Sequence, residues 1–209
     1  MLFSLVPFID FYMAHMRKFG SDEIILTNGE GVMRFFLSVC ALFLFLGTSV
    51  YAGEYPHRIK TSEMEFSWRL DADRLYVNLS AFTKSWVGIG FNPVKKMKGA
   101  NFILGHVENG VLKLVDEVGT GLTRHQNDNL FGGGMDVTAI AGSLVNGRTN
   151  IEFSLPLQSG DINDSEINSR GENIILLAHG WKMNNLRKKH SYRAKFKVNL
   201  QTGKYVKLL

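Results

Sequence analysis

Two side chains of this sequence, Met97 and His190, form a pair with a well-defined chemistry. Met97 follows a glycine-rich hydrophobic segment at residues 86–91, and His190 begins an alternating segment near the C-terminus. A thioether and an imidazole together can occupy both axial positions of a haem iron. An iron with both positions filled has no open site for oxygen or substrate, so it can only exchange electrons. The pair therefore indicates an electron carrier rather than a catalyst.

Each of the two residues also fits an ordinary structural role. Met97 lies in a loop after Pro93, and an isolated loop methionine is seldom a ligand. His190 could be a buried histidine that is satisfied by hydrogen bonds. His179, at the end of an apolar run and just before Gly180, is the alternative histidine ligand.

A secretory signal peptide is predicted at residues 33–52. The segment has one positive charge at Arg34, an apolar run at residues 35–46 and a small-residue cleavage site that ends at Ala52. The run is shorter than the roughly 20 residues that a membrane-spanning helix needs. We therefore expect a mature protein of residues 53–209 that is periplasmic or extracellular and has no integral membrane segment.

Residues 1–32 precede this signal peptide and carry no pattern typical of a domain. Gly29-Glu30-Gly31 can be encoded by a purine-rich stretch that resembles a bacterial ribosome-binding site just before the codon of Met33. We expect translation to begin at Met33, so that residues 1–32 are a misassigned N-terminal extension. A genuine long leader, or a second membrane-associated segment at residues 2–13, is the alternative. Codons for residues 29–31 that are not purine-rich would contradict this expectation.

Cleavage after Ala52 would remove Cys40, the one cysteine of the chain. A mature chain without cysteine excludes disulfides, thiolate zinc sites, iron-sulfur clusters and covalent attachment of haem. Any haem in residues 53–209 must therefore be held without a covalent bond.

Short strands are predicted throughout residues 53–209, which form one domain. Hydrophobic and polar residues alternate with period two in residues 64–70 and 75–81, which is typical of half-buried strands. Further strands are expected at residues 111–118 and 149–155. The chain after residue 53 has no helix-length segment with a 3.6-residue period. These features predict an all-β fold, an antiparallel β-sandwich.

Two sequence pairs and one apolar run refine this prediction. Asn109-Gly110 and Asn146-Gly147 predict tight hairpins, because asparagine and glycine tolerate the positive φ of a type I′ turn. The nearly continuous apolar run at residues 174–178 predicts a central strand. In the last alternating segment, residues 190–199, His190 is expected on the same face as Tyr192 and to point into the sandwich.

Two polar segments could suggest a metal site. Residues 119–135 form a predicted loop that contains His125, Asp128 and Asn129, and residues 161–164 contain two aspartates. Neither spacing matches a ligand motif, so we interpret both segments as solvated loops.

The sequence resembles the DOMON domain family over about residues 62–200. The resemblance lies in a Trp/Gly/Phe strand, a Met-x-Gly-Ala loop and a late histidine. The matching positions are Trp86-Val-Gly-Ile-Gly-Phe91, Met97-Lys-Gly-Ala-Asn101, Gly105, Asp116, Phe153-Ser-Leu-Pro-Leu157, Gly160-Asp161, Ile174 to Ala178, and His190. Asn101 departs from the family, where aspartate is common, and Leu155 replaces a frequent basic residue.

The resemblance implies an immunoglobulin-like sandwich of about ten strands that binds haem b or, in other members, a sugar-like ligand. It is closest in kind to the haem-binding type, such as the cytochrome domain of cellobiose dehydrogenase. In that type the axial ligands match Met97 and His190, so the haem iron is the expected metal. Aromatic residues are expected to line the cofactor pocket: Trp86, Phe91, Phe102, Trp181 and Tyr192.

Two function hypotheses remain open from the sequence. The first is an exported haem b electron-transfer domain, which is not an enzyme. The second is a carbohydrate or small-ligand-binding module without haem, in which Trp86, Trp181 and Tyr192 stack on the ligand. No serine-histidine-aspartate spacing, phosphate-binding glycine loop or HExxH motif is present, so no catalytic residues are predicted.

Basic residues gather around His190. The whole chain has a formal net charge of +5, and six of its basic residues lie close together: Arg187, Lys188, Lys189, Arg193, Lys195 and Lys197. Such a cluster can discourage aggregation of an edge strand, or it can steer an acidic partner. We expect an acidic redox partner protein and, because of the export signal, no nucleic acid.

Overall fold

The structure, a computed structural model, describes residues 55–181, 186 and 188–209. The predicted signal peptide, Cys40 and the start at Met33 lie outside these residues. In the described part of the chain, no helix has the length and apolar character needed to cross a membrane.

The described residues form β-strands and one short 3-10 helix. In chain order the elements are β1 (His57–Lys60), β2 (Met64–Asp71), β3 (Arg74–Ala81), β4 (Val87–Phe91), β5 (Asn101–Glu108), β6 (Val111–Gly121), β7 (Arg124–Asn127), η1 (Asp128–Phe131), β8 (Thr138–Val145), β9 (Arg148–Pro156), β10 (Glu172–Gly180), β11 (His190–Asn199) and β12 (Tyr205–Lys207). The predicted all-β class is confirmed.

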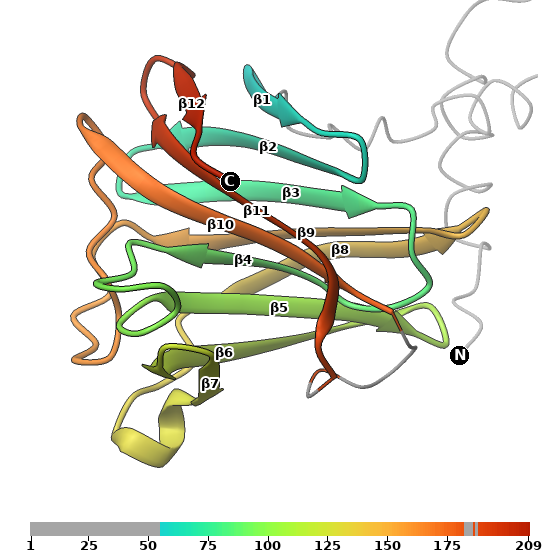
Figure 1. The fold of residues 1–209 in the computed structure, drawn as a ribbon, viewed down its shortest axis with the longest axis horizontal. Helices are drawn as coiled ribbons and strands as arrows, with labels where there is room; N and C mark the ends of the chain where they lie inside the picture. Colours follow the sequence, from blue (N-terminus) through green and yellow to red (C-terminus); the bar gives the residue numbers. More distant parts are fainter. Residues whose placement is uncertain (1–54, 182–185, 187) are drawn as a thin grey trace, which may run out of the picture. The chain divides into compact units, whose positions relative to one another are not determined.

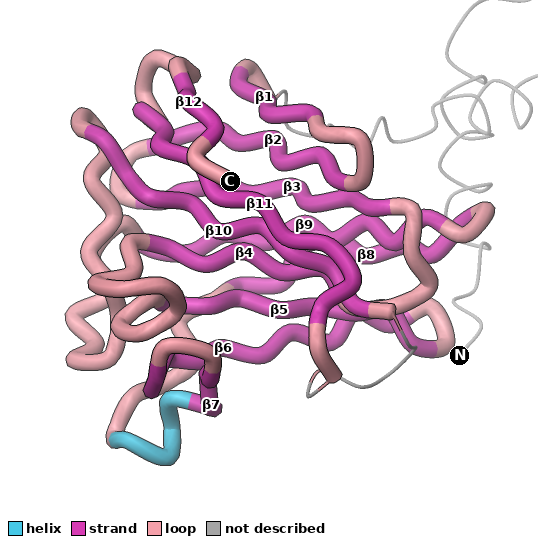
Figure 2. The backbone as a smooth tube through the Cα atoms, in the orientation of Figure 1, coloured by secondary structure: helices cyan, strands magenta, loops and turns pink. Residues whose placement is uncertain are grey.

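Two antiparallel sheets make the sandwich. One sheet has the strand order β1-β2-β3-β9-β8, and the other has the order β12-β11-β10-β4-β5-β6-β7. Figure 1 shows the two sheets face to face, and Figure 2 shows that strands form both layers while loops join them at the ends. This arrangement is the antiparallel β-sandwich that the alternating pattern predicts, and it agrees with the immunoglobulin-like sandwich that the family resemblance implies.

Two hairpin turns have the geometry that their sequences predict. Asn109 and Gly110, between β5 and β6, have φ values of 51° and 77°. Asn146 and Gly147, between β8 and β9, have φ values of 51° and 76°. Positive φ at both central residues defines the type I′ turn, whose twist matches that of the flanking strands.

The main core lies between the sheets and joins them. Trp68 on β2 is fully buried, and its ring stacks on Phe66 with centroids 4.6 Å apart. The Trp68 indole Nε1 donates a hydrogen bond of 2.8 Å to the carbonyl of Leu200, the residue after β11. This side chain therefore links the five-stranded sheet to the end of a strand in the seven-stranded sheet.

Strand β10 lies inside the seven-stranded sheet, between β11 and β4, as its apolar run predicts. Ile175 and Leu177 point into the core. Leu176 and Ala178 point to the other face, where they pack against a second apolar cluster. The run is continuous because both faces of this strand contact apolar groups.

The segment at residues 119–135 is more regular than predicted. β6 continues to Gly121, and β7 and η1 follow within the same range. The side chain of Asn127 accepts a hydrogen bond from the Asn129 N–H at 3.0 Å and so caps η1. The prediction of a loop is wrong here because β7 is an edge strand with exposed, polar side chains, which gives no apolar alternation.

Candidate functional site

The outer face of the seven-stranded sheet has no side chains along the middle of β4. This strand places its alternate hydrophobic residues in the core, so Gly88 and Gly90 face outward. Side chains from β5 lie over the two glycines. A Cβ atom on Gly90 would overlap the ring of Phe102, and one on Gly88 would lie 3.1 Å from Cγ of Leu104. The glycines therefore give this face a flat, close-packed surface.

A second apolar cluster lies on this outer face, separate from the main core. Its buried members are Trp86, Ala100, Phe102 and Leu104, against which Met97, Val115, Leu176, Ala178 and Leu186 pack while partly buried. The outer face of a sandwich normally meets water and is polar. An apolar cluster on this face departs from that pattern and makes the face the candidate site.

The loop between β4 and β5 brings Met97 to this cluster. The Gly99 N–H donates to the Gly119 carbonyl at 2.8 Å, and the Gly119 N–H donates to the Ala100 carbonyl at 2.9 Å. Gly119 needs to be glycine because a Cβ atom there would overlap the carbonyl of Met97. The loop backbone is thus fixed against β6, and this contact positions Met97 on the outer face.

A β-bulge turns His190 to the same outer face. His179 pairs with Tyr192, but the next residue, Gly180, pairs with His190, so Ser191 is an extra residue in β11. Directly paired residues share a face, and Gly180 faces outward, because it lies two residues after Ala178. The prediction that His190 points into the sandwich is therefore wrong. The bulge shifts the alternation by one residue between Tyr192 and His190.

Met97 and His190 approach the cluster from opposite ends. β4 ends at Phe91, just before the loop that carries Met97, whereas Val87 at the start of β4 pairs with His179, next to the Gly180–His190 pair. Figure 1 shows the loop after β4 and the start of β11 at opposite ends of the seven-stranded sheet. A flat group that stands on the face between them could therefore receive one ligand from each side.

The surroundings of His190 favour the neutral form of its imidazole. Partial burial lowers the pKa of His190 from its ordinary value of 6.5, and the nearby charges of Arg193, Lys189 and His125 lower it further. A neutral imidazole has the free lone pair that binding to a metal requires. At neutral pH this side chain is therefore ready to act as a ligand.

Two residues that the sequence did not single out for this face, Glu117 and His125, lie at its edge. Glu117 is paired with Phe102, so it shares the outer face, and it is only 3% exposed. The Nδ1 atom of His125 contacts the Glu117 carboxylate, and its ring lies 5.3 Å from that of Phe102. Period-two alternation from Val115 would have placed Glu117 here, but nothing local marks His125.

His179, the alternative ligand, lies on the inner face of β10. It is 6% exposed and stacks on Tyr192 with ring centroids 5.6 Å apart. Its Nδ1 atom is 3.0 Å from the Ser191 hydroxyl, and its Nε2 atom is 3.6 Å from the carboxylate of Glu63. The structure therefore does not bring His179 or Tyr192 to the cluster that holds Met97.

The other aromatic candidates divide among three places. Trp86 and Phe102 belong to the outer apolar cluster. Phe91 is fully buried in the main core, because it follows Val87 and Ile89 on the inward face of β4. Trp181 is 77% exposed beyond the end of β10. The indole Nε1 of Trp86 is buried and has no hydrogen-bond partner among the described residues, so one polar atom of this cluster is unsatisfied.

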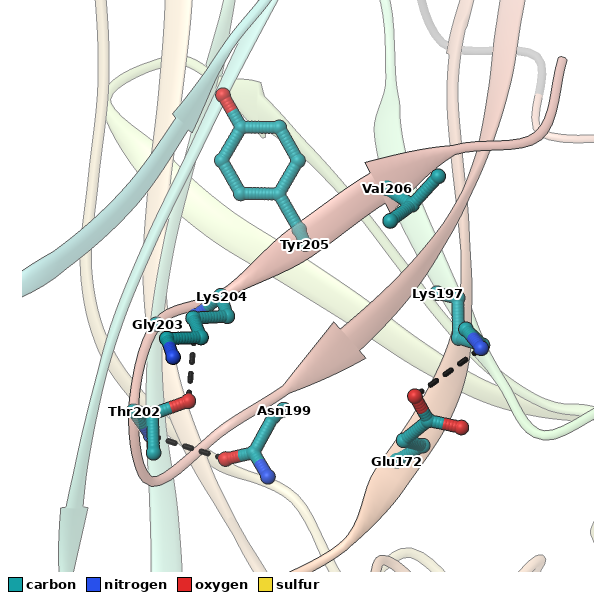
Figure 3. A pocket seen from close by; sticks show the side chains of 8 residues that line it. All are labelled: Glu172, Lys197, Asn199, Thr202, Gly203, Lys204, Tyr205 and Val206. Atoms are coloured by element: carbon teal, nitrogen blue, oxygen red, sulfur yellow. Dashed lines mark hydrogen bonds and ion pairs between the residues drawn. The ribbon is translucent and has the colours of Figure 1, made fainter.

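A surface hollow lies at the opposite edge of the seven-stranded sheet. Figure 3 shows its lining residues on β10, β11, β12 and the turn that joins the last two: Glu172, Lys197, Asn199, Thr202, Gly203, Lys204, Tyr205 and Val206. Lys197 and Glu172 form an ion pair of 3.0 Å there. None of these residues belongs to the outer apolar cluster, so the hollow is separate from the candidate site.

The sequence profile of the DOMON domain matches residues 60–180. This match covers more than half of the chain. The chain belongs to the DOMON domain family. The match ends at Gly180, so β11 and His190 lie beyond it, and their place in the site rests on the strand register alone.

Two solved structures have a similar fold. The fold is similar to the cytochrome b domain of pyranose dehydrogenase from Coprinopsis cinerea, with a TM-score of 0.54 and 13% identity over 70% of this chain and 82% of that one. It is also similar to the cytochrome domain of Myriococcum thermophilum cellobiose dehydrogenase, with a TM-score of 0.51 and 12% identity over 67% and 79% of the two chains.

A mouse protein is also similar to this chain in sequence. DBH-like monooxygenase protein 1 of Mus musculus is 28% identical over 128 residues, which are 60% of this chain. Those residues are 20% of the mouse protein, so the chain spans about a fifth of that relative's length.

Proposed function

We propose that this DOMON domain binds haem b without a covalent bond, that Met97 and His190 are its axial ligands, and that it transfers electrons. The observation that carries the proposal is the β-bulge at Ser191, which places His190 on the same apolar face as Met97. The likeness in fold to two cytochrome domains supports the same function.

The residues on this face fit haem. The glycines of β4 leave a flat apolar surface, and the apolar cluster can contact the edge of a porphyrin. The unsatisfied Nε1 of Trp86 and the neutral imidazole of His190 are polar atoms that a bound group would engage. Basic side chains beside His190, Lys189 and Arg193, can neutralise the propionates.

Each residue has a distinct task in this proposal. Met97 and His190 would hold the iron, and the apolar cluster would exclude water from it. The contact between Glu117 and His125 keeps a polar group in place at the edge of the site. Haem supplies a one-electron couple whose potential is raised by methionine ligation. With both axial positions filled by the protein, the domain would carry electrons and would not activate oxygen.

Substitution Met97→Ala is expected to leave a five-coordinate haem that binds carbon monoxide. The imidazole of His190 remains as the stronger ligand, so haem is retained but its midpoint potential falls. Absorbance spectra of the reduced protein with and without carbon monoxide measure the change. The matched control is Met135→Ala, since Met135 is 51% exposed and lies outside the cluster. If the Met97→Ala protein still does not bind carbon monoxide, Met97 is not a ligand of the iron.

An acidic redox protein is the proposed partner. The outer face of β11 carries Arg193 and Lys195 beside His190, and Lys188 and Lys189 precede it in exposed positions. Electrons would leave through the exposed haem edge, so a partner must dock near this face.

Reduction by an acidic redox protein is expected to slow as salt rises, because the screening length falls to about 10 Å at 0.1 M ionic strength. Stopped-flow rates should also fall for the double variant Lys188→Glu, Lys189→Glu. The matched control reverses two distant charges, Lys60→Glu and Lys204→Glu. Equal rates for both double variants, with no dependence on salt, would assign the basic residues to solubility alone.

Export through the predicted signal peptide at residues 33–52 completes the proposal. Edman or mass-spectrometric analysis of the secreted protein should find Gly53 at its N-terminus. A peptide from residues 1–32 in the purified protein would contradict both the start at Met33 and cleavage at Ala52.

A carbohydrate-binding function is the second candidate. A surface hollow that includes His179 is lined by the aromatic residues Phe82, Trp181 and Tyr192. Phe82 and Trp181 are 65% and 77% exposed, which suits stacking on a sugar ring. Glycan-array binding that is lost in Trp181→Ala, in a protein that takes up no haem, would favour this function.

A further inference from the structure

Three carboxylates from separate segments, two of them buried and one partly buried, meet at one end of the sandwich. They belong to Asp116 on β6, Asp128 in η1 and Asp164 in the connection between β9 and β10. One oxygen of each lies within 4.8 Å of the others. Asp116 is 2% exposed and Asp128 is 1% exposed. The interpretation as a solvated loop is therefore wrong for Asp128, which the fold buries, whereas Asn129 is exposed and residues 161–164 are a loop with partly or fully exposed side chains.

The two most buried carboxylates lack the partners that buried charges need. Both oxygens of Asp116 and both of Asp128 are buried without a hydrogen-bond partner in the described chain. No ion pair among the described residues involves Asp116, Asp128 or Asp164. Isolated buried charges cost several kcal/mol unless they are neutralised or coordinate a metal.

Asn101 gives independent support for a cation site at this cluster. Its Nδ2 donates a hydrogen bond of 2.5 Å to Asp164, which ties its amide to the cluster. Asn101 is 3% exposed, yet its carbonyl oxygen Oδ1 is buried and unpartnered. Ionised carboxylates have no hydrogen to donate to this oxygen, but the oxygen can join them as a ligand to a cation.

The surrounding loops are built to bring the carboxylates together. A Cβ atom on Gly133 would lie 2.7 Å from Asp128 Oδ2 and 2.9 Å from Asp161 Oδ2, so glycine is needed for this approach. The Gly134 N–H donates to Asp161 at 2.6 Å and the Asn163 N–H at 2.7 Å. Figure 1 shows the loops after η1 and after β9 at the same end of the sandwich.

We propose that Asp116, Asp128, Asp164 and Asn101 form a Ca²⁺ site that joins these two loops to β5 and β6. Oxygens that bind one Ca²⁺ at 2.3–2.6 Å lie within about 5 Å of one another, which agrees with the carboxylate spacing. Carboxylate and amide oxygens without histidine or cysteine favour Ca²⁺ over transition metals. This site is distinct from the outer face that holds Met97, because Asp116 pairs with Ile103 and points to the inner side.

The titration of the cluster agrees with this geometry. Burial raises the pKa of Asp116 to about 8, and the charges of Asp164, Asp128 and Asp136 contribute, although a nearby backbone N–H of Asp136 opposes them. Burial likewise raises the pKa of Asp164 to about 6, with the charges of Asp161, Asp136 and Asp128 adding to it. Without a cation, folding takes up protons between pH 4 and pH 8, so stability falls as pH rises through that window.

Thermal unfolding of residues 53–209 at pH 8 in EDTA and in Ca²⁺ tests the site. At a Ca²⁺ concentration 100-fold above the dissociation constant, we expect the Tm to rise by about 5–10 °C. Mg²⁺ should give a smaller rise, because it prefers water and strict octahedral geometry. At pH 5.5 the Ca²⁺ response should shrink as protons compete for the carboxylates. All of these unfolding measurements use protein without haem, so their outcome does not depend on the proposed function.

Matched variants assign the response to these residues. Asp116→Asn and Asp128→Asn should lose the Ca²⁺-dependent rise, and in EDTA at pH 8 each should be as stable as the parent or more so. The control Asp73→Asn, at an exposed turn, should keep the full rise. Equal Tm values of the parent in Ca²⁺ and EDTA, a Mg²⁺ response equal to that of Ca²⁺, or an undiminished response in both variants would overturn the proposal.

Equilibrium dialysis with ⁴⁵Ca²⁺ covers the case in which both variants fail to fold. One ion per chain in the parent protein supports the site. Absence of binding at 1 mM Ca²⁺ would overturn the proposal. Protonation would then be the way in which the buried carboxylates are neutralised.

Discussion

Replacement of His190 by alanine is expected to abolish haem retention. The substitution removes the stronger of the two proposed ligands and leaves Met97 alone on the opposite side of the iron. Loss of even a supporting group around a metal ligand costs about 10-fold to 100-fold in affinity, so loss of the ligand should exceed 100-fold. The purified variant should pass through gel filtration without a Soret band, and added imidazole should restore part of the band.

The matched control for this experiment is His179→Ala. His179 lies on the inner face of β10, so its removal should leave the haem spectrum unchanged even if the protein becomes less stable. Circular dichroism checks that both variants are folded. A His179→Ala protein that loses haem while His190→Ala keeps it would exchange the two assignments.

Replacement of Trp68 by alanine is expected to cause the largest loss of stability. The substitution opens a cavity between the sheets, removes the stacking on Phe66 and leaves the Leu200 carbonyl without its donor. Replacement of a buried tryptophan by alanine costs about 3–5 kcal/mol, and the lost hydrogen bond adds to this. In a domain of this size the Tm should fall by about 10 °C or more.

Trp181→Ala is the control for Trp68→Ala, because it removes the same side chain from a position that is 77% exposed. Its free energy of unfolding should change by less than about 0.5 kcal/mol. Urea denaturation of both variants gives the comparison. Similar losses in the two proteins would contradict the central place of Trp68 between the sheets.

The fold could be predicted because local signals and global architecture agree. Period-two alternation in residues 64–81 marks two strands of one sheet, and the paired Asn-Gly sequences define two hairpins. The continuous apolar run at residues 174–178 belongs to a strand with apolar contacts on both faces. In each case one short stretch of sequence carries the information.

The face of His190 could not be predicted, because alternation assumes a regular strand. Ser191 adds one residue to β11, and its hydroxyl contacts Nδ1 of His179 and donates to the Gly180 carbonyl, which stabilises the bulge. A bulge leaves no reliable mark in the sequence. The orientation of Phe91, in contrast, follows directly from the alternation of glycine and hydrophobic residues in β4.

The carboxylate cluster could not be predicted from the sequence for a different reason. Asp116, Asp128 and Asp164 come from three segments: Asp116 lies in a predicted strand, whereas Asp128 and Asp164 stand among polar neighbours that are typical of exposed loops. Their burial depends on the approach of two loops at Gly133, a tertiary contact. Spacing along the chain therefore gave no metal motif, although the spatial arrangement offers one.

Absorbance spectroscopy of residues 53–209 during titration with haem tests the central claim most directly. The account predicts that one haem binds per chain. The reduced protein should show the sharp α and β bands of a low-spin, six-coordinate iron and should not bind carbon monoxide. A protein that gains no Soret band at any haem concentration, with its fold intact by circular dichroism, would contradict the claim that Met97 and His190 share a haem on this face.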